Sequence, residues 1–202
     1  VAAGLHPGFF FDVLPATLIP VAAGWQTVEV RKPSSAASWP KGTRHMQGIG
    51  GEPARLEAEL PYPMESSARL VVEAVGGVVG TIDESRTAVV RDIPIRLDDE
   101  VIEPGLATGY RQECRATLED GRTVTLTWDV VVDDPSDPPR DRAYRVEVTG
   151  GPAAGMHVTI DGDFTSDPYP ATVERMLHVA AAVRRLGPGV HVVTDAGVSR
   201  SA

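Results

Sequence analysis

A long stretch of two-residue alternation is the feature that most constrains how this 202-residue chain can fold. Between residues 85 and 164, apolar and polar side chains alternate repeatedly, which is typical of strands with one buried and one solvated face. One such run has apolar members Val124, Leu126, Trp128 and Val130. Asp120-Gly121 is typical of a two-residue hairpin turn. We therefore predict an antiparallel or mixed sheet, built as a meander of four or five strands.

Helical periodicity lies on both sides of this stretch. Helices are predicted at 9–14, 52–60, 63–75 and 168–186, strands at 25–31 and 190–193, and a long loop at 33–51. The last helix has Asp167 as its candidate N-cap and ends at Gly187-Pro188. Its apolar stripe consists of Val173, Met176, Leu177, Ala180 and Val183. The predicted fold class is α+β, with the helices packed on one face of the sheet.

Composition excludes several classes of protein. The net charge of −9 disfavours nucleic acid or an anionic membrane as the main partner. The single cysteine, Cys114, rules out an internal disulfide and favours a reducing compartment, so we expect a cytoplasmic protein. No apolar run approaches the roughly 20 residues that span a bilayer. We predict one domain over 1–196 and a disordered tail over 197–202.

Known catalytic motifs are missing from the sequence. It has no glycine-rich dinucleotide fingerprint, no phosphate loop, no nucleophile elbow and no zinc-binding helix. The five histidines are scattered, and no metal site is expected. The acidic segment 133–141 is predicted to be a solvated loop rather than a cation site. The residues alone therefore leave the catalytic groups unknown.

Several blocks of sequence nevertheless resemble one dehydrogenase family in the same order. The first block, GLHPGFFFDVLP at 4–15, is similar to a G-[VT]-N-P-G-F-x-x-D-x-L-P segment. The others are HMQGIGGEPARL, PMESSARLVVEAVGG, EPGLATGYR and DPYPATVERMLHVAAAVRRLGPGVHVVTD. Together they resemble the C-terminal domain of 2,4-diaminopentanoate dehydrogenases, native amine dehydrogenases and dihydrodipicolinate reductase-like proteins. Two departures are His6, where the family has Asn, and a missing D-L-P after Asp195.

The resemblance implies a role within a larger oxidoreductase. In this family a Rossmann domain binds NAD or NADP and carries the general acid/base carboxylate. The domain that this chain resembles closes the substrate pocket and forms a homodimer through its β-sheet. We therefore expect this chain to bind a small amine-type substrate and to lack the Rossmann domain. The complete enzyme would transfer a hydride to or from an amine or imine carbon, and this chain alone would be inactive.

The resemblance also points to candidate site residues near the substrate or the cofactor. His6, Pro7, Gly8, Phe9 and Phe10 carry the motif, and glycine lets the backbone approach a ligand closely. The remaining candidates are Asp12, Met46, Gln47 and Gly48. For Asp12, a satisfied structural carboxylate is the preferred interpretation.

A second hypothesis stays open beside the first. The chain could be a stand-alone module that binds a small apolar ligand or dimerises, with no catalytic activity. If this chain is a domain without its cofactor domain, it should expose an apolar patch around residues 5–14, where the missing domain would pack. A stand-alone module should bury the same residues.

Overall fold

The computed structural model describes residues 4–6, 8–134, 140–151, 155–162, 168–189, 191, 192 and 195. Five α-helices form within these residues. They are α1 (Val13–Leu18), α2 (Lys41–Met46), α3 (Pro53–Ala58), α4 (Glu65–Ala74) and α5 (Tyr169–Val183), and a 3-10 helix, η1 (Ile19–Val21), follows α1. None of the described helices is long and apolar enough to cross a membrane.

The strands form a six-stranded mixed sheet in the order β2-β5-β6-β1-β7-β8, and a separate two-stranded hairpin, β3-β4. Their bounds are β1 (Thr27–Ser35), β2 (Val79–Val90), β3 (Ile95–Arg96), β4 (Val101–Ile102), β5 (Ala107–Leu118), β6 (Thr123–Val131), β7 (Tyr144–Thr149) and β8 (Met156–Ile160). The mixed sheet is confirmed, but a simple meander is wrong. β1 lies between β6 and β7, parallel to the first and antiparallel to the second.

Alternation sets which side chains each strand buries. In β6, Val124, Leu126, Trp128 and Val130 are buried, and Thr125, Thr127 and Asp129, which alternate with them, lie on the opposite, polar face. The Asp120-Gly121 turn is longer than predicted, because β5 ends at Leu118 and β6 begins at Thr123. Within this turn, only Gly121 has a positive φ, of 89°. A two-residue type I′ turn needs positive φ at both central residues, and Asp120 does not adopt it.

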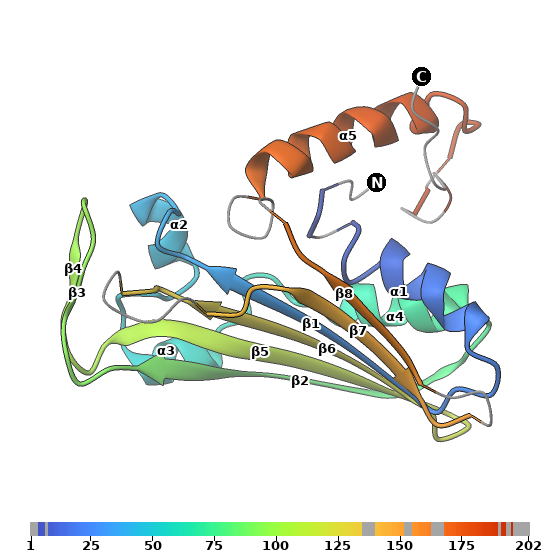
Figure 1. Cartoon of the computed structure of the whole chain (residues 1–202), viewed down its shortest axis with the longest axis horizontal. Coiled ribbons are helices and arrows are strands. Elements are labelled where there is room, and N and C mark those ends of the chain that lie inside the picture. The colour runs from blue at the N-terminus through green and yellow to red at the C-terminus, as the bar shows by residue number, and fades with distance from the viewer. Residues whose placement is uncertain are drawn as a thin grey trace.

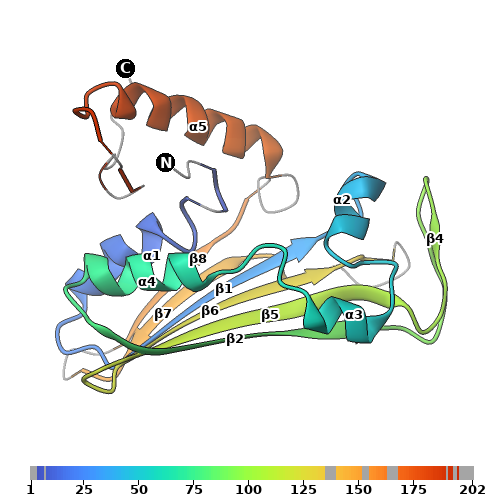
Figure 2. The ribbon, with the colours of Figure 1, turned by 180° about the vertical axis from the view of Figure 1, so that it is seen from behind.

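The helices cover one face of the sheet (Figures 1 and 2). α1 and α4 lie over this face at one end, and α5 lies above them, with the first described residues beneath it. α2 lies at the other end, where the β3-β4 hairpin projects beyond the sheet. The main hydrophobic core is therefore between the sheet and the helices, and includes Phe11, Val71 and Leu126. The predicted α+β class with helices on one face is confirmed.

Three element predictions need correction. α2 falls inside the segment 33–51 that was predicted to be a loop, and β1 continues to Ser35. β2 begins at Val79, before the alternation predicted from residue 85, and ends at Val90. The predicted strand 190–193 is not seen at the described residues His191 and Val192, and its other residues and Asp167 lie outside the described residues.

The apolar stripe of α5 faces outward. Val173, Met176 and Leu177 are more than half exposed, whereas Val179 and Ala182 are buried. The buried side of the helix rests near the N-terminal segment, where Ala171 packs against a small cluster formed by Leu5, Phe10 and Tyr144. Helical periodicity located the apolar stripe but not the surface that it contacts.

Candidate functional site

A cavity of about 370 Å³ lies where the N-terminal segment, β1, β6, α2, α4 and α5 come together. Two tryptophans, Trp39 and Trp128, form part of its wall, and three groups from distant parts of the sequence bring nitrogen atoms to it. These groups are His6, Lys32 and Gln47. Ligand sites in proteins have this character, an apolar hollow with a few convergent polar groups.

Lys32 is the least expected of these residues. It follows Val28 and Val30 at the same parity on β1, so its side chain points to the buried face of the sheet, where only 6% of its surface is exposed. No hydrogen bond or ion pair to its ammonium group is found among the described residues. Burial lowers the pKa of Lys32 from its ordinary value to about 7.

Trp128 is the platform on which the cavity groups rest. Lys32 and Trp128 are direct partners in the parallel β1-β6 ladder. The Lys32 Nζ lies 4.7 Å from the centre of a Trp128 ring, a cation–π distance. The indole N–H donates to the Oγ of Ser34 at 3.0 Å, which fixes the ring plane.

His6 packs against the same tryptophan from the N-terminal segment. Its ring centre is 4.6 Å from that of Trp128 and 4.7 Å from that of Phe11, both in edge-on arrangements. Burial lowers the pKa of His6 well below its ordinary value, and the Lys32 charge lowers it further. The ring is therefore neutral near pH 7, and its buried Nδ1 has no hydrogen-bond partner among the described residues. A neutral imidazole can donate through one nitrogen and accept through the other.

Gln47 is held in the cavity wall by a network in the core. Its amide oxygen accepts from the Tyr110 hydroxyl at 3.1 Å and from Arg86 at 3.2 Å. Arg86 also donates to the carbonyl oxygens of Gln47 and Glu59, and its guanidinium lies 3.7 Å from the Tyr110 ring centre. These contacts leave the amide NH₂ of Gln47 without a partner among the described residues.

Only two of the candidate residues from the sequence, His6 and Gln47, line this cavity. Phe10 packs on Tyr144 with 4.1 Å between ring centres, and Phe9 lies against Phe10 and Arg175. The Asp12 carboxylate accepts a hydrogen bond from the Gly8 backbone N–H, so it holds the turn together. Pro7 lies outside the described residues.

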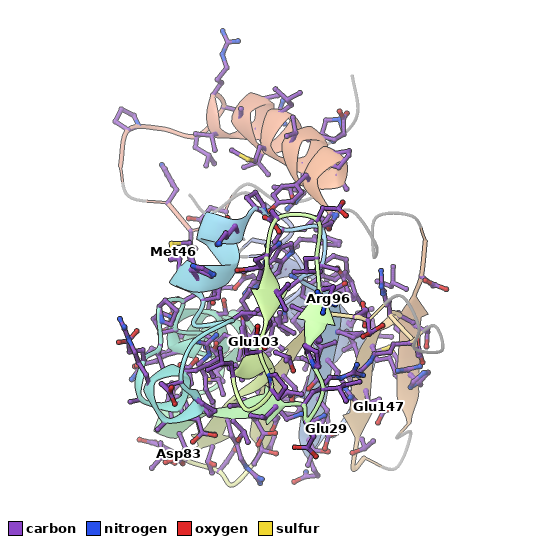
Figure 3. The ribbon with its side chains drawn as sticks, turned by 90° about the vertical axis from the view of Figure 1, so that its left-hand side faces the viewer. Glu29, Met46, Asp83, Arg96, Glu103 and Glu147 are labelled. Atoms are coloured by element: carbon purple, nitrogen blue, oxygen red, sulfur yellow. The ribbon has the colours of Figure 1, made fainter. Side chains whose placement is uncertain are left out.

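The segment after α2 is anchored in the core. The Gly50 N–H donates to the Ala107 carbonyl, and the Ala107 N–H donates to the Gly51 carbonyl, at 2.8 and 2.9 Å. Gly48 lines a smaller hollow beside α3 instead of the main cavity. Met46 is half exposed at the end of α2, on the outside of the molecule (Figure 3). These contacts differ from those expected of a loop that closes over a substrate.

A larger hollow, of about 650 Å³, lies on the polar face of the sheet. Its charged groups already satisfy one another: Asp129 accepts from Arg31 and from Arg111, each at 2.6 Å. Arg142 likewise pairs with Asp133 at 2.6 Å. Because these charges are paired within the chain, the Lys32 cavity is the stronger candidate for a ligand site.

Sequence reasoning missed Lys32, although a signal for it exists. A lysine at the parity of two buried valines is an unusual residue for the inner face of a strand. The predicted strand ended one residue too early to include it. No cluster of residues that could hold a metal ion is found among the described residues.

Comparisons with known proteins place this geometry in a known fold. No protein-family model and no curated protein matches the sequence. The structure of an amine dehydrogenase from Mycobacterium smegmatis superposes with a TM-score of 0.80 and 17% identity over 99% of this chain. This chain has that fold. It covers 59% of the amine dehydrogenase chain, so a large part of that protein has no counterpart here.

A second structure is much less similar. It is a biliverdin reductase from Synechocystis sp. PCC 6803, in complex with biliverdin and NADP⁺, with a TM-score of 0.43 and 7% identity. The match covers 96% of this chain and 55% of that one.

Proposed function

We propose that this chain forms the substrate-binding and dimerisation domain of an NAD(P)-dependent dehydrogenase that acts on a C–N bond and that it is inactive alone. The observation that carries the proposal is the cavity, in which His6, from the family-like HPGF segment, meets Gln47 and Lys32. The amine dehydrogenase fold supports the same assignment. Hydride transfer would take place at the border between this chain and a Rossmann domain.

The fit of a nicotinamide cofactor can be judged at His6. The buried Nδ1 of this neutral ring has no hydrogen-bond partner in the described part of the chain, and a nicotinamide carboxamide both donates and accepts hydrogen bonds. His6 can therefore replace the family's Asn as the residue that contacts the carboxamide. A nicotinamide supplies or accepts the hydride, and this chain positions the substrate and excludes water. We expect the phosphates of the cofactor to be bound by the Rossmann domain.

The exposed stripe of α5 provides a surface on which such a domain can dock. Val173, Met176 and Leu177 form an apolar row on the exposed side of α5. Tyr169, at the start of the same helix, lines the cavity and is half exposed. A domain seated on this row would reach the cavity mouth, where the substrate and the nicotinamide must meet.

The polar face of the sheet is where we propose that two copies meet. Across β1 and β7, Glu29 stands opposite Glu147, and Arg31 stands opposite Arg145 (Figure 3 shows the two glutamates). Like charges on facing residues of neighbouring strands are unfavourable. Arg31, Arg145 and Glu147 have ion-pair partners within the chain, whereas no ion pair of Glu29 is found among the described residues. A second copy related by a two-fold axis would set a basic residue against Glu29. Because this face is charged, the proposed interface is held by ion pairs rather than by apolar contacts.

The dimer is tested by light scattering on the purified protein. Glu29→Arg should weaken the dimer at least about tenfold, because it brings like charges together. Glu103→Arg makes the same charge change away from β1 and β7 and should leave the dimer intact. A wild-type monomer, or equal effects of the two variants, would contradict this interface.

The enzymatic proposal is tested on the protein purified from its source cells. Its intact mass should exceed the 21.5 kDa of this chain by a cofactor domain, or such a domain should co-purify as a subunit. The preparation should reduce NAD or NADP with simple amines. His6→Asn should retain this activity, and His6→Leu should lower kcat/KM. A protein of 21.5 kDa, without a partner and without activity, would contradict the proposal.

Two observations favour the alternative of a stand-alone binding module without catalysis. Most apolar side chains of residues 5–14, including Leu5, Phe10 and Phe11, are buried within this chain, as expected of such a module and not of a severed domain. The cavity is lined by residues of this chain only and needs no second domain to form. Tight binding of small apolar ligands by a protein of 21.5 kDa in its source cells would support this alternative.

A further inference from the structure

The cavity is basic, although the chain as a whole is acidic. The net charge is −9, but no aspartate or glutamate is among the described residues that line the cavity. The ammonium group of Lys32 therefore has no counter-ion in the described structure. An unpaired buried charge is costly, and proteins usually keep one only where a ligand or a reaction uses it.

Further hydrogen-bond donors surround Lys32. The amide NH₂ of Gln47 has no partner, since Arg86 and Tyr110 occupy only the oxygen of that amide. Ser66 and Ser67, in the first turn of α4, contribute hydroxyl groups and the positive end of a ten-residue helix. The carboxylate of Glu84, which does not line the cavity, accepts hydrogen bonds from the backbone N–H groups of Met64 and Glu65 at 2.8 and 3.2 Å.

We propose that the cavity binds a small organic carboxylate and that the carboxylate group pairs with the ammonium of Lys32, assisted by Gln47 and the serines of α4. This inference deepens the proposed function and rests on it, because it names the class of substrate for the same site. The preferred substrate is then an amino acid or oxo acid, and simple amines, which lack the carboxylate, are slower substrates of the same site. Lys32 is its specificity-determining residue.

The charge of Lys32 also orients the substrate. A substrate ammonium gains nothing beside a second cation, so the reacting amine must lie at the end of the molecule away from Lys32. The carboxylate at Lys32 fixes one end, and the C–N bond points to the cavity mouth near Tyr169, where a nicotinamide can reach it. The Trp39 and Trp128 rings then contact the carbon chain between the two ends.

Two probes of the same shape test the inference. Pentanoate and its neutral amide, pentanamide, are titrated into the 202-residue chain at pH 6.5 and constant ionic strength, with calorimetry and tryptophan NMR signals as readouts. The wild type should bind pentanoate at least tenfold more tightly than pentanamide. Lys32→Met, which keeps the length of the side chain and removes its charge, should bind the two probes within twofold of each other.

The other lysine of the chain gives the matched control. Lys41 is half exposed, pairs weakly with Glu100 at 3.8 Å and does not line the cavity, so Lys41→Met should keep the tenfold preference. Circular dichroism checks that both variants are folded. Equal binding of the two probes by the wild type, or a preference that survives Lys32→Met, would overturn the inference. Either result leaves the assay with simple amines as an independent test of the proposed function.

Discussion

Lys32 and Trp128 face each other across the only parallel strand pair among the described strands, and the ammonium lies 4.7 Å from the indole ring. The same row continues across the sheet to Gln112 on β5 and Arg86 on β2. Polar side chains thus cross the buried face of the sheet in a line. A core optimised for stability alone would place apolar residues there, so the row indicates a site.

The first prediction concerns the titration of Lys32. Its pKa should be about 7, because burial disfavours the charged form. The chain has only two lysines, so [¹³C]lysine labelling yields two Cε signals, and Lys32→Met identifies which is which. A transition for Lys32 above pH 9 would contradict the buried, unpaired position of its ammonium.

The same shift has a consequence for stability. Between pH 7 and 10.5 the unfolded lysine is protonated and the folded one is not, so the unfolded state binds more protons. The free energy of unfolding must therefore rise with pH in this window. Relative to Lys32→Met, the wild type should gain about 2 kcal/mol between pH 7 and pH 9, measured by urea unfolding. The comparison with the variant cancels other groups that titrate.

Residue patterns located most of the sheet but not the site. The alternation in β6 is strict, so its buried face follows from the sequence. The sequence pattern did not predict Lys32 as an inward-facing residue, because a charged residue normally ends a run of buried apolar positions. In the fold, the ring of Trp128 provides a surface against which the Lys32 side chain packs on the buried face. His6 was found only through its neighbours in the HPGF string. Nothing in its own spacing relates it to Lys32, 26 positions away, because the topology of the sheet brings them together.

The second prediction concerns Arg44, which is only 1% exposed. Its Nε donates to Glu100 at 2.6 Å, and its other nitrogens reach Asp99 and the Trp39 carbonyl. These contacts fasten α2, beside the cavity, to the β3-β4 hairpin. Arg44→Met should lower the free energy of unfolding by about 1.5–3 kcal/mol, because Glu100 loses its buried partner and keeps only His45 and Lys41, which are half exposed.

An arginine at the surface provides the comparison for Arg44. Arg55 is 78% exposed and pairs with Glu59 one turn away at 3.0 Å. Arg55→Met should change stability by less than about 0.5 kcal/mol. Losses of the same size in both variants would show that Arg44 is not the anchor of the hairpin.

The third prediction concerns Cys114, whose thiol is fully buried in the core. Burial raises its pKa to about 12, and the charges of Glu84, Glu65 and Asp83 raise it as well. Because the thiolate is the reactive form, the folded protein should not react with Ellman's reagent at pH 8. One thiol per chain should react at once after unfolding in urea. Rapid reaction of the folded protein would place Cys114 at the surface.

The last prediction separates the two faces of α5. Leu177 is 62% exposed and Val179 only 2%, although they are two residues apart. Leu177→Glu should change the stability of the chain by less than about 0.5 kcal/mol, since it alters a solvated position. Val179→Glu should cost about 3 kcal/mol or more, because it buries a charge without a partner. Urea unfolding of both variants measures the difference.

The same pair of variants shows what the exposed face of α5 is for. If a cofactor domain docks on this face, Leu177→Glu should impair the NAD(P)-dependent activity of the complete protein while its stability in the isolated chain is unchanged. If no domain docks on this face, Leu177→Glu should leave both the activity and the stability unchanged. Equal destabilisation by Leu177→Glu and Val179→Glu in the isolated chain would mean that α5 buries both faces, and the docking surface would then have to lie elsewhere.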